Sequence, residues 1–151
     1  MVESVFAVIS DIHGNLEALE EALRDIDRRH IKTVYCLGDV VGYGASPKEC
    51  LDQVIERCEV ILCGNHDHAV FYEPTNFNVG AEKAAYWTRQ VLEDEKDKKK
   101  RNRRWEVLGR LPMHCAALAP QLRRARRAVK VARCHGEGTC HANAIDDHQR
   151  A

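Results

Sequence analysis

Short apolar runs alternate with amphipathic stretches over the first 92 positions of the chain. Residues 4–10, 33–37 and 59–63 are mostly apolar and β-branched, which is typical of strands buried on both faces. Residues 16–29 lie between the first two runs and carry apolar side chains at helical spacing, namely Leu16, Leu19, Leu23 and Ile26. The alternation of strand and helix predicts an α/β fold with a largely parallel sheet.

A second helix is predicted between the second and third strands. Ser46 is expected as its N-cap, Pro47 as its first residue and Glu49 as the residue that completes a capping box. Its buried face should carry Leu51, Val54, Ile55 and Cys58.

After the third strand, the sequence predicts a loop over residues 67–78 and then one long helix over residues 79–104. The inward face of this helix should consist of Ala81, Ala84, Ala85, Thr88, Val91 and Leu92. Its last part, residues 93–104, has eleven charged residues in twelve positions. Because acidic residues precede basic ones, we interpret it as a solvated helix end in preference to a nucleic-acid site.

Length and composition indicate one domain with a core of ordinary size. The chain has 151 residues, 44% of them apolar, and a formal net charge of zero. No apolar run approaches the roughly 20 residues that span a bilayer, and the first residues lack the basic start of a signal peptide. Seven cysteines form no CxxC pair and are expected to be reduced. These features predict a cytoplasmic protein without a membrane partner.

The last 38 residues differ from the rest in composition. Residues 114–151 contain seven basic and three acidic residues and no Phe, Tyr or Trp. We therefore expect a domain over residues 1–113, followed by an atypical basic tail that is disordered or derived from a shifted reading frame. The tail includes a group of potential metal ligands, but its spacing matches no familiar zinc pattern, and we interpret Cys134, His135, Cys140 and His141 as incidental.

Three short polar motifs follow the three predicted strands. Residues 11–15 read DIHGN, residues 38–44 read GDVVGYG and residues 64–67 read GNHD. Taken singly, each motif is ordinary turn chemistry. Since the carboxyl ends of parallel strands share one edge of the sheet, however, the three motifs should converge. Carboxylate, imidazole and amide groups together are suitable ligands for divalent transition metals.

These motifs resemble the signature of the calcineurin-like metallophosphoesterases, in particular their small bacterial phosphodiesterases and predicted phosphatases. The resemblance covers roughly residues 4–112 and implies the N-terminal half of the family's α/β sandwich. It implies that Asp11 and His13 bind a first metal, that Asp39 bridges two metals and that Asn65 binds the second. His66 would then be the catalytic histidine, and Asp67 would orient its imidazole.

The resemblance also implies a reaction. A hydroxide that bridges two divalent cations would attack phosphodiesters or small phosphomonoesters, with manganese as the first choice of metal and iron, zinc or nickel as other candidates. Residues 42–44 read GYG where the protein phosphatase branch has Asp-Arg-Gly, which argues against a phosphoprotein substrate. We expect a small phosphoester as substrate, and the sequence leaves a homo-oligomer open. Nucleic-acid binding through the basic runs 123–127 and 98–104 is disfavoured, because neither run is interleaved with the aromatic residues that stack on single strands.

One departure from the family pattern keeps an alternative open. The family completes its metal shell with later histidines in a Gly-His-x-His context, and the sequence has no such motif. The alternative is a truncated, catalytically impaired member that binds one metal or none.

Overall fold

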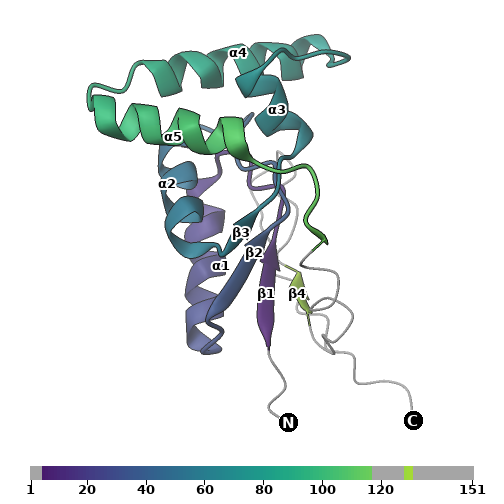
Figure 1. Ribbon diagram of the computed structural model, residues 1–151, viewed down its shortest axis with the longest axis vertical. Coiled ribbons are helices and arrows are strands. Elements are labelled where there is room, and N and C mark those ends of the chain that lie inside the picture. Colours follow the sequence, from purple (N-terminus) through teal and green to yellow (C-terminus); the bar gives the residue numbers. More distant parts are fainter. Residues whose placement is uncertain (1–4, 117–127, 131–151) are drawn as a thin grey trace.

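A four-stranded sheet forms the centre of the protein in a computed structural model that describes residues 5–116 and 128–130. The strands are β1 (Phe6–Ile9), β2 (Thr33–Cys36), β3 (Val60–Ile61) and β4 (Ala128–Lys130). Their order is β3-β2-β1-β4, and all three neighbouring pairs are parallel (Figure 1). The expectation of an α/β fold with a parallel sheet is confirmed.

The third strand is shorter than the predicted span of residues 59–63. The backbone N–H of Leu62 still donates to the Cys36 carbonyl at 2.9 Å, but the next N–H, that of Cys63, donates to the carbonyl of Pro112 at 2.9 Å. The segment after α5 therefore pairs with the outer edge of the chain directly after β3, next to the point where the ladder to β2 ends.

Two helices cover one face of the sheet. They are α1 (Leu16–Arg28) and α2 (Pro47–Arg57). The Asn15 side chain caps α1 by accepting the Ala18 N–H at 3.0 Å. The core between helices and sheet is built from side chains at alternate strand positions and helical spacing, including Ala7, Ile9, Leu19, Leu23, Ile26, Val34, Leu51 and Val54.

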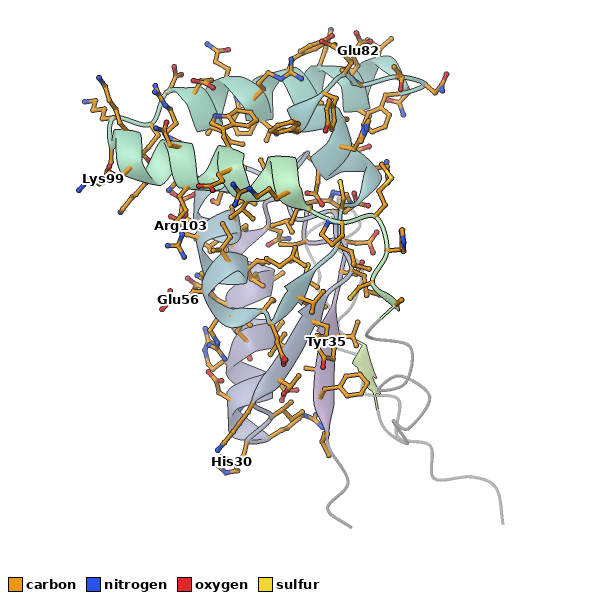
Figure 2. The ribbon with its side chains drawn as sticks, in the orientation of Figure 1. His30, Tyr35, Glu56, Glu82, Lys99 and Arg103 are labelled. Atoms are coloured by element: carbon orange, nitrogen blue, oxygen red, sulfur yellow. The ribbon has the colours of Figure 1, made fainter. Side chains whose placement is uncertain are left out.

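The opposite face of the sheet carries a smaller cluster. The rings of Phe6 and Tyr35 lie 5.3 Å apart between centroids, and both residues are buried. Tyr35 is labelled in Figure 2, on the side of the sheet away from α1 and α2. Cys115 packs against this cluster, so the segment after α5 contributes to both the edge and the face of the sheet.

The prediction of a capping box at the start of α2 is wrong. Ser46 precedes α2 but its side chain makes no capping hydrogen bond. Its backbone N–H donates instead to the Gly14 carbonyl at 3.0 Å, which ties the start of α2 to the loop after β1. Pro47 is the first helical residue, as predicted.

Three more helices lie at the carboxyl end of the sheet: α3 (Asn65–Phe71), α4 (Val79–Glu93) and α5 (Lys98–Arg110). The sequence predicted a loop where α3 lies. A tertiary contact stabilises the end of this short helix, because the Arg89 guanidinium from α4 donates to the carbonyls of Val70, at 2.9 Å, and of Tyr72. The sequence of residues 65–71 does not by itself indicate this contact with Arg89.

The prediction of one long helix over residues 79–104 is also wrong. The chain turns between α4 and α5, which run antiparallel (Figure 1). Asp97 starts α5 by accepting the backbone N–H groups of Lys99 and Lys100 at 2.9 and 3.3 Å. Glu95 in the turn accepts the Asp97 N–H at 3.1 Å, which stabilises the break.

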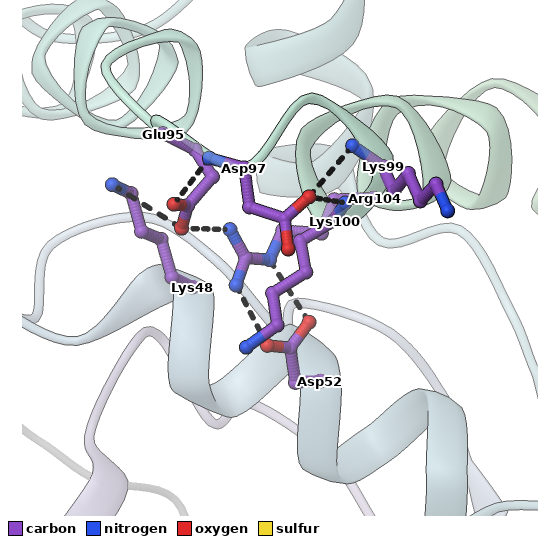
Figure 3. Close-up of polar contacts among 7 residues, drawn as sticks. All are labelled: Lys48, Asp52, Glu95, Asp97, Lys99, Lys100 and Arg104. Carbon is purple, nitrogen blue, oxygen red and sulfur yellow. Dashed lines mark hydrogen bonds and ion pairs between the residues drawn. The ribbon is translucent and has the colours of Figure 1, made fainter.

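The break brings one cation of the charged run into a partly buried ion cluster (Figure 3). Arg104 is only 3% exposed. Its guanidinium binds the Asp52 carboxylate of α2 with two hydrogen bonds, of 2.9 and 2.6 Å, and Glu95 with one of 2.9 Å. The run is thus solvated in part, as Lys99 and Arg103 show in Figure 2, but Arg104 joins three elements.

Some sequence features lie outside the described residues, namely the cluster of Cys134, His135, Cys140 and His141 and the basic run 123–127. Within the part of the chain that the structure covers, no helix combines the length and the apolar character needed to cross a membrane.

We expect Arg104→Met to lower the free energy of unfolding by about 1–3 kcal/mol, because it leaves two carboxylates without their partner. The figure is below that of a fully buried pair, since the side chain of Asp52 is 41% exposed. Urea unfolding measures the change. Arg103→Met, on the exposed side of the same helix, is the control, and equal effects of the two variants would contradict the role of the cluster.

The same cluster predicts a dependence of stability on pH. The hydrogen bond from Arg104 and the Asp97 N–H lower the pKa of Glu95 from 4.5 to about 2. A lowered pKa stabilises the folded state above pH 4.5, and this contribution is lost as the pH falls toward 2. Glu95→Gln should therefore differ from wild type in unfolding free energy at pH 6 and progressively less at pH 4 and 3. A difference that is constant over this range would refute the prediction.

Candidate metal centre

The loops after β1 and β2 run side by side at the carboxyl edge of the sheet. The backbone N–H of His13 donates to the Asp39 carbonyl at 2.9 Å, and that of Gly14 donates to Val40 at 2.9 Å. A third bond of 3.2 Å joins the Asp11 N–H to Gly38. The two motifs that the sequence predicts to converge are therefore joined through their backbones.

The Asp67 carboxylate joins the third motif to the second. One oxygen accepts the N–H groups of Asp39 at 2.7 Å and Gly64 at 3.0 Å, and the other accepts those of Val40 and Val41 at 2.9 and 3.2 Å. The side chain is 1% exposed. Burial raises the pKa of Asp67 to about 6, although the donated N–H groups oppose the rise.

These partners differ from the one we expected for Asp67. From the sequence we expected this carboxylate to orient the imidazole of His66. In the structure, its hydrogen bonds all come from backbone N–H groups. In the structure, Asp67 is thus a residue that positions the two loops.

Glycine is required where the third motif touches the second. A Cβ at Gly64 would overlap the Asp39 carboxylate, and one at Gly42 would lie 2.7 Å from the His66 Nδ1. Gly42 also has a φ of 96°, a conformation that L side chains rarely adopt. The spacing of glycines in the motifs therefore reflects close packing of three loops.

Residues with strained backbone are concentrated in the same loops. Asp11, His13, Asp39 and Tyr43 have φ values of 56°, 50°, 54° and 55°. They are four of the six described non-glycine residues with positive φ. Each such conformation costs of order 1–3 kcal/mol and persists only where surrounding contacts enforce it. That concentration favours a functional explanation for this edge of the sheet.

Asp11, His13 and Asp39 form the core of the site. One ligand atom from each lies within 4.8 Å of the others, and the His13 Nε2 is 4.0 Å from the nearer Asp11 oxygen. Two carboxylates and an imidazole are a donor set that suits manganese, iron or zinc.

Hydrogen bonds around the three residues leave one donor atom of each available. Ser10 donates to one oxygen of Asp11 at 2.8 Å, and the His66 N–H donates to one oxygen of Asp39 at 2.8 Å. The His13 Nδ1 lies 3.3 Å from the Val41 carbonyl. Because a carbonyl only accepts, Nδ1 carries the hydrogen, and the Nε2 lone pair faces Asp11. This support is typical of metal ligands, and the residues fit a divalent cation.

His66 lies against the core of the site. Its ring centroid is 4.7 Å from that of His13 and 4.8 Å from that of Phe77. The side chain is 7% exposed, and its Nδ1 has no hydrogen-bond partner among the described residues. Burial and the neighbouring His13 lower the pKa of His66, while Asp39 and Asp11 oppose the shift.

Asn65 is exposed at the first position of α3 and lines a pocket of about 340 Å³ next to the site. The pocket is lined by Cys63, Gly64, Asn65, His68, Ala69, Glu73, Thr75, Phe77 and Met113. Apart from the GNHD residues, no sequence motif marks these residues as parts of a site. His68, Glu73 and Met113 are single residues without a motif, and only the folding of α3 and the turn after α5 brings them together.

Comparisons with known proteins agree with the fold and identify the family. A model of the calcineurin-like phosphoesterase family matches residues 4–148, so the chain belongs to this family. The matched range extends beyond position 113, and the expected division of the chain there stays a prediction.

Two relatives illustrate how much of a longer protein the chain resembles. It is 46% identical over 97 residues to an uncharacterized protein of Methanocaldococcus jannaschii, a match that covers 63% of this chain and 40% of that protein. The crystal structure of a metallophosphoesterase from Sphaerobacter thermophilus is similar with a TM-score of 0.55 and 36% identity, over 71% of this chain and 41% of that one. The chain thus spans about two fifths of the length of either protein.

Asp67→Asn should lower the free energy of unfolding by roughly 2–4 kcal/mol, because an amide offers one acceptor oxygen where four N–H groups now have two. The same change should weaken Mn²⁺ binding, since it loosens the loop that carries Asp39. Urea unfolding and calorimetric titration with Mn²⁺ measure both effects. Asp94→Asn, at the exposed end of α4, is the control, and an Asp67 variant as stable as this control would contradict the argument.

Proposed function

We propose that the chain hydrolyses phosphodiesters or small phosphomonoesters in a metal-dependent reaction at the edge of the sheet. The observation that carries the proposal is the convergence of Asp11, His13 and Asp39 within 4.8 Å in a member of a phosphoesterase family. The strained backbone at these residues and the orientation of their free donor atoms support it.

In this proposal, Asp11, His13 and Asp39 hold the metal. Divalent cations supply phosphoester chemistry with charge neutralisation on the phosphoryl oxygens and with a lower pKa for water. Ser10 and the Val41 carbonyl keep the Asp11 and His13 side chains in place, so that little reorganisation accompanies binding.

We propose His66 as the proton donor to the substrate. Its imidazole contacts the His13 ring and is excluded from bulk water, so a hydrogen bond that it donates to a phosphoryl or leaving-group oxygen is stronger than in solution. We propose Asn65 as a further oxygen ligand, because it begins the helix that follows Gly64 and borders the pocket.

We further propose that the site binds two manganese ions. The alternative, a catalytically impaired member that binds one metal or none, rests on the finding that His and carboxylate side chains in the described ranges form one group of three. We propose a cytoplasmic location and a small phosphoester as the partner. Cys36, Cys58, Cys63 and Cys115 form no disulfide among the described residues, which supports a reducing compartment.

The metal content of the purified chain tests the proposal. Elemental analysis after dialysis against Mn²⁺ should give two ions per chain, and one ion would support the alternative. Asp39→Asn should lose bound metal and abolish turnover of bis(p-nitrophenyl) phosphate. His66→Ala should keep the metal and lose activity by roughly 10²–10⁴-fold, as expected for a proton donor. Turnover that survives Asp39→Asn would rule out a metal-dependent reaction at this site.

A further inference from the structure

Tyr43 places an exposed aromatic ring next to the two histidines of the site. Its ring centroid lies 4.6 Å from that of His66 and 5.3 Å from that of His13. The residue is 54% exposed. One side of the ring therefore covers the imidazoles, and much of the rest faces solvent at the mouth of the metal centre.

The backbone fixes the position of this ring. Tyr43 has a φ of 55° and lies between Gly42 and Gly44. The Gly44 N–H donates to the His13 carbonyl at 2.7 Å, and a Cβ at Gly44 would overlap that same oxygen. Because Gly42 is packed against the His66 ring, the loop is held on both sides of Tyr43.

Folding alone gives little reason for a tyrosine at this position. Glycine or asparagine adopts a positive φ at lower cost, and a ring that is half exposed buries little apolar surface. Phe77, on another side of His66, differs in this respect, since it packs against the main core. Tyr43 belongs to neither hydrophobic cluster of the described residues.

Other exposed aromatic residues lie away from the metal ligands. Tyr86 and Trp87 are 44% and 43% exposed on α4, and the Tyr86 hydroxyl is bound to Glu73. Tyr72 stacks on Phe71 and His68 after α3. Among the residues described, Tyr43 thus combines solvent exposure with contact to the site histidines.

We propose that Tyr43 determines specificity by stacking on a planar ring of the substrate, either a nucleobase or another aromatic group attached to the phosphoester. The proposal rests on the proposed function of the site. An aromatic side chain stacks on any planar ring, and one such contact contributes about 5- to 150-fold in affinity, the equivalent of ~1–3 kcal/mol. The ring is already positioned, so binding need not order it.

Paired ligands that differ only in the planar group test this role. Calorimetry on the full chain with Mn²⁺ compares adenosine 5′-monophosphate with ribose 5-phosphate, and phenyl phosphate with cyclohexyl phosphate. Wild type should bind the first member of a pair at least fivefold more tightly. Tighter binding of the first member in both pairs would indicate that the site accepts any aromatic group. Tighter binding in the adenosine pair alone would indicate that it accepts a nucleobase.

Variants at Tyr43 then assign the preference to its ring. Tyr43→Leu should remove the preference with little effect on ribose 5-phosphate, whereas Tyr43→Phe should retain it. Trp87→Leu, which removes another exposed aromatic ring on α4, is the control and should behave as wild type. Loss of the preference in Tyr43→Phe as complete as in Tyr43→Leu would overturn the proposal, because the hydroxyl and not the ring would then be responsible.

The outcomes separate this inference from the proposed function. Equal binding of both members of each pair, in a chain that hydrolyses bis(p-nitrophenyl) phosphate, would overturn the role of Tyr43 and leave the function intact. If wild type binds none of the four ligands and hydrolyses no phosphoester, both proposals are wrong.

Discussion

The site depends on one buried carboxylate that accepts hydrogen bonds from two loops. Asp67 satisfies four backbone N–H groups, three from the loop after β2 and one from the turn before α3. Left without an acceptor, buried N–H groups would each cost free energy comparable to a lost hydrogen bond. The charge is tolerated because these four donors offset the cost of its burial. The carboxylate therefore fixes the loop that presents Asp39 relative to the helix that begins with Asn65 and His66.

Strain and close packing around this carboxylate have a common cause. Three loops must approach one another closely enough to bring Asp11, His13 and Asp39 within 4.8 Å. That approach leaves no room for a Cβ at Gly64, and it requires left-handed backbone at the ligand residues themselves. The strands β1 and β2 and the helices α1 and α2 enclose the main core. The packing of this core stabilises the fold enough to maintain the strained loop conformations.

The helices at the carboxyl end are held by arginines that bridge distant parts of the chain. Arg104 joins α5 to α2 and to the turn after α4, and Arg89 joins α4 to the end of α3 (Figure 3 shows the first of these clusters). The Arg89 guanidinium binds carbonyl groups at the end of α3, and the Arg104 guanidinium binds two partly buried carboxylates. These groups would lose hydrogen bonds without the arginines. The pocket beside Asn65 is lined by α3, by residues between α3 and α4 and by Met113 after α5, so its shape depends in part on how Arg89 holds the end of α3.

The sequence by itself determined three parallel strands, the helices α1 and α2 and the motifs at the carboxyl edge, because apolar runs, period-3.6 patterns and glycine-rich turns are local properties of a chain. It did not determine β4, which pairs with β1 from the segment expected to be a tail. It did not determine α3, the break before Asp97 or the buried state of Arg104. The end of α3 and the buried state of Arg104 depend on partners up to 52 positions away, as the pair of Arg104 with Asp52 shows. The break was missed although the contacts of Glu95 and Asp97 that stabilise it are local. The partners of Asp67 and the exposed ring of Tyr43 were likewise decided by tertiary structure, since only the folded loops bring the backbone N–H groups and the histidines beside them.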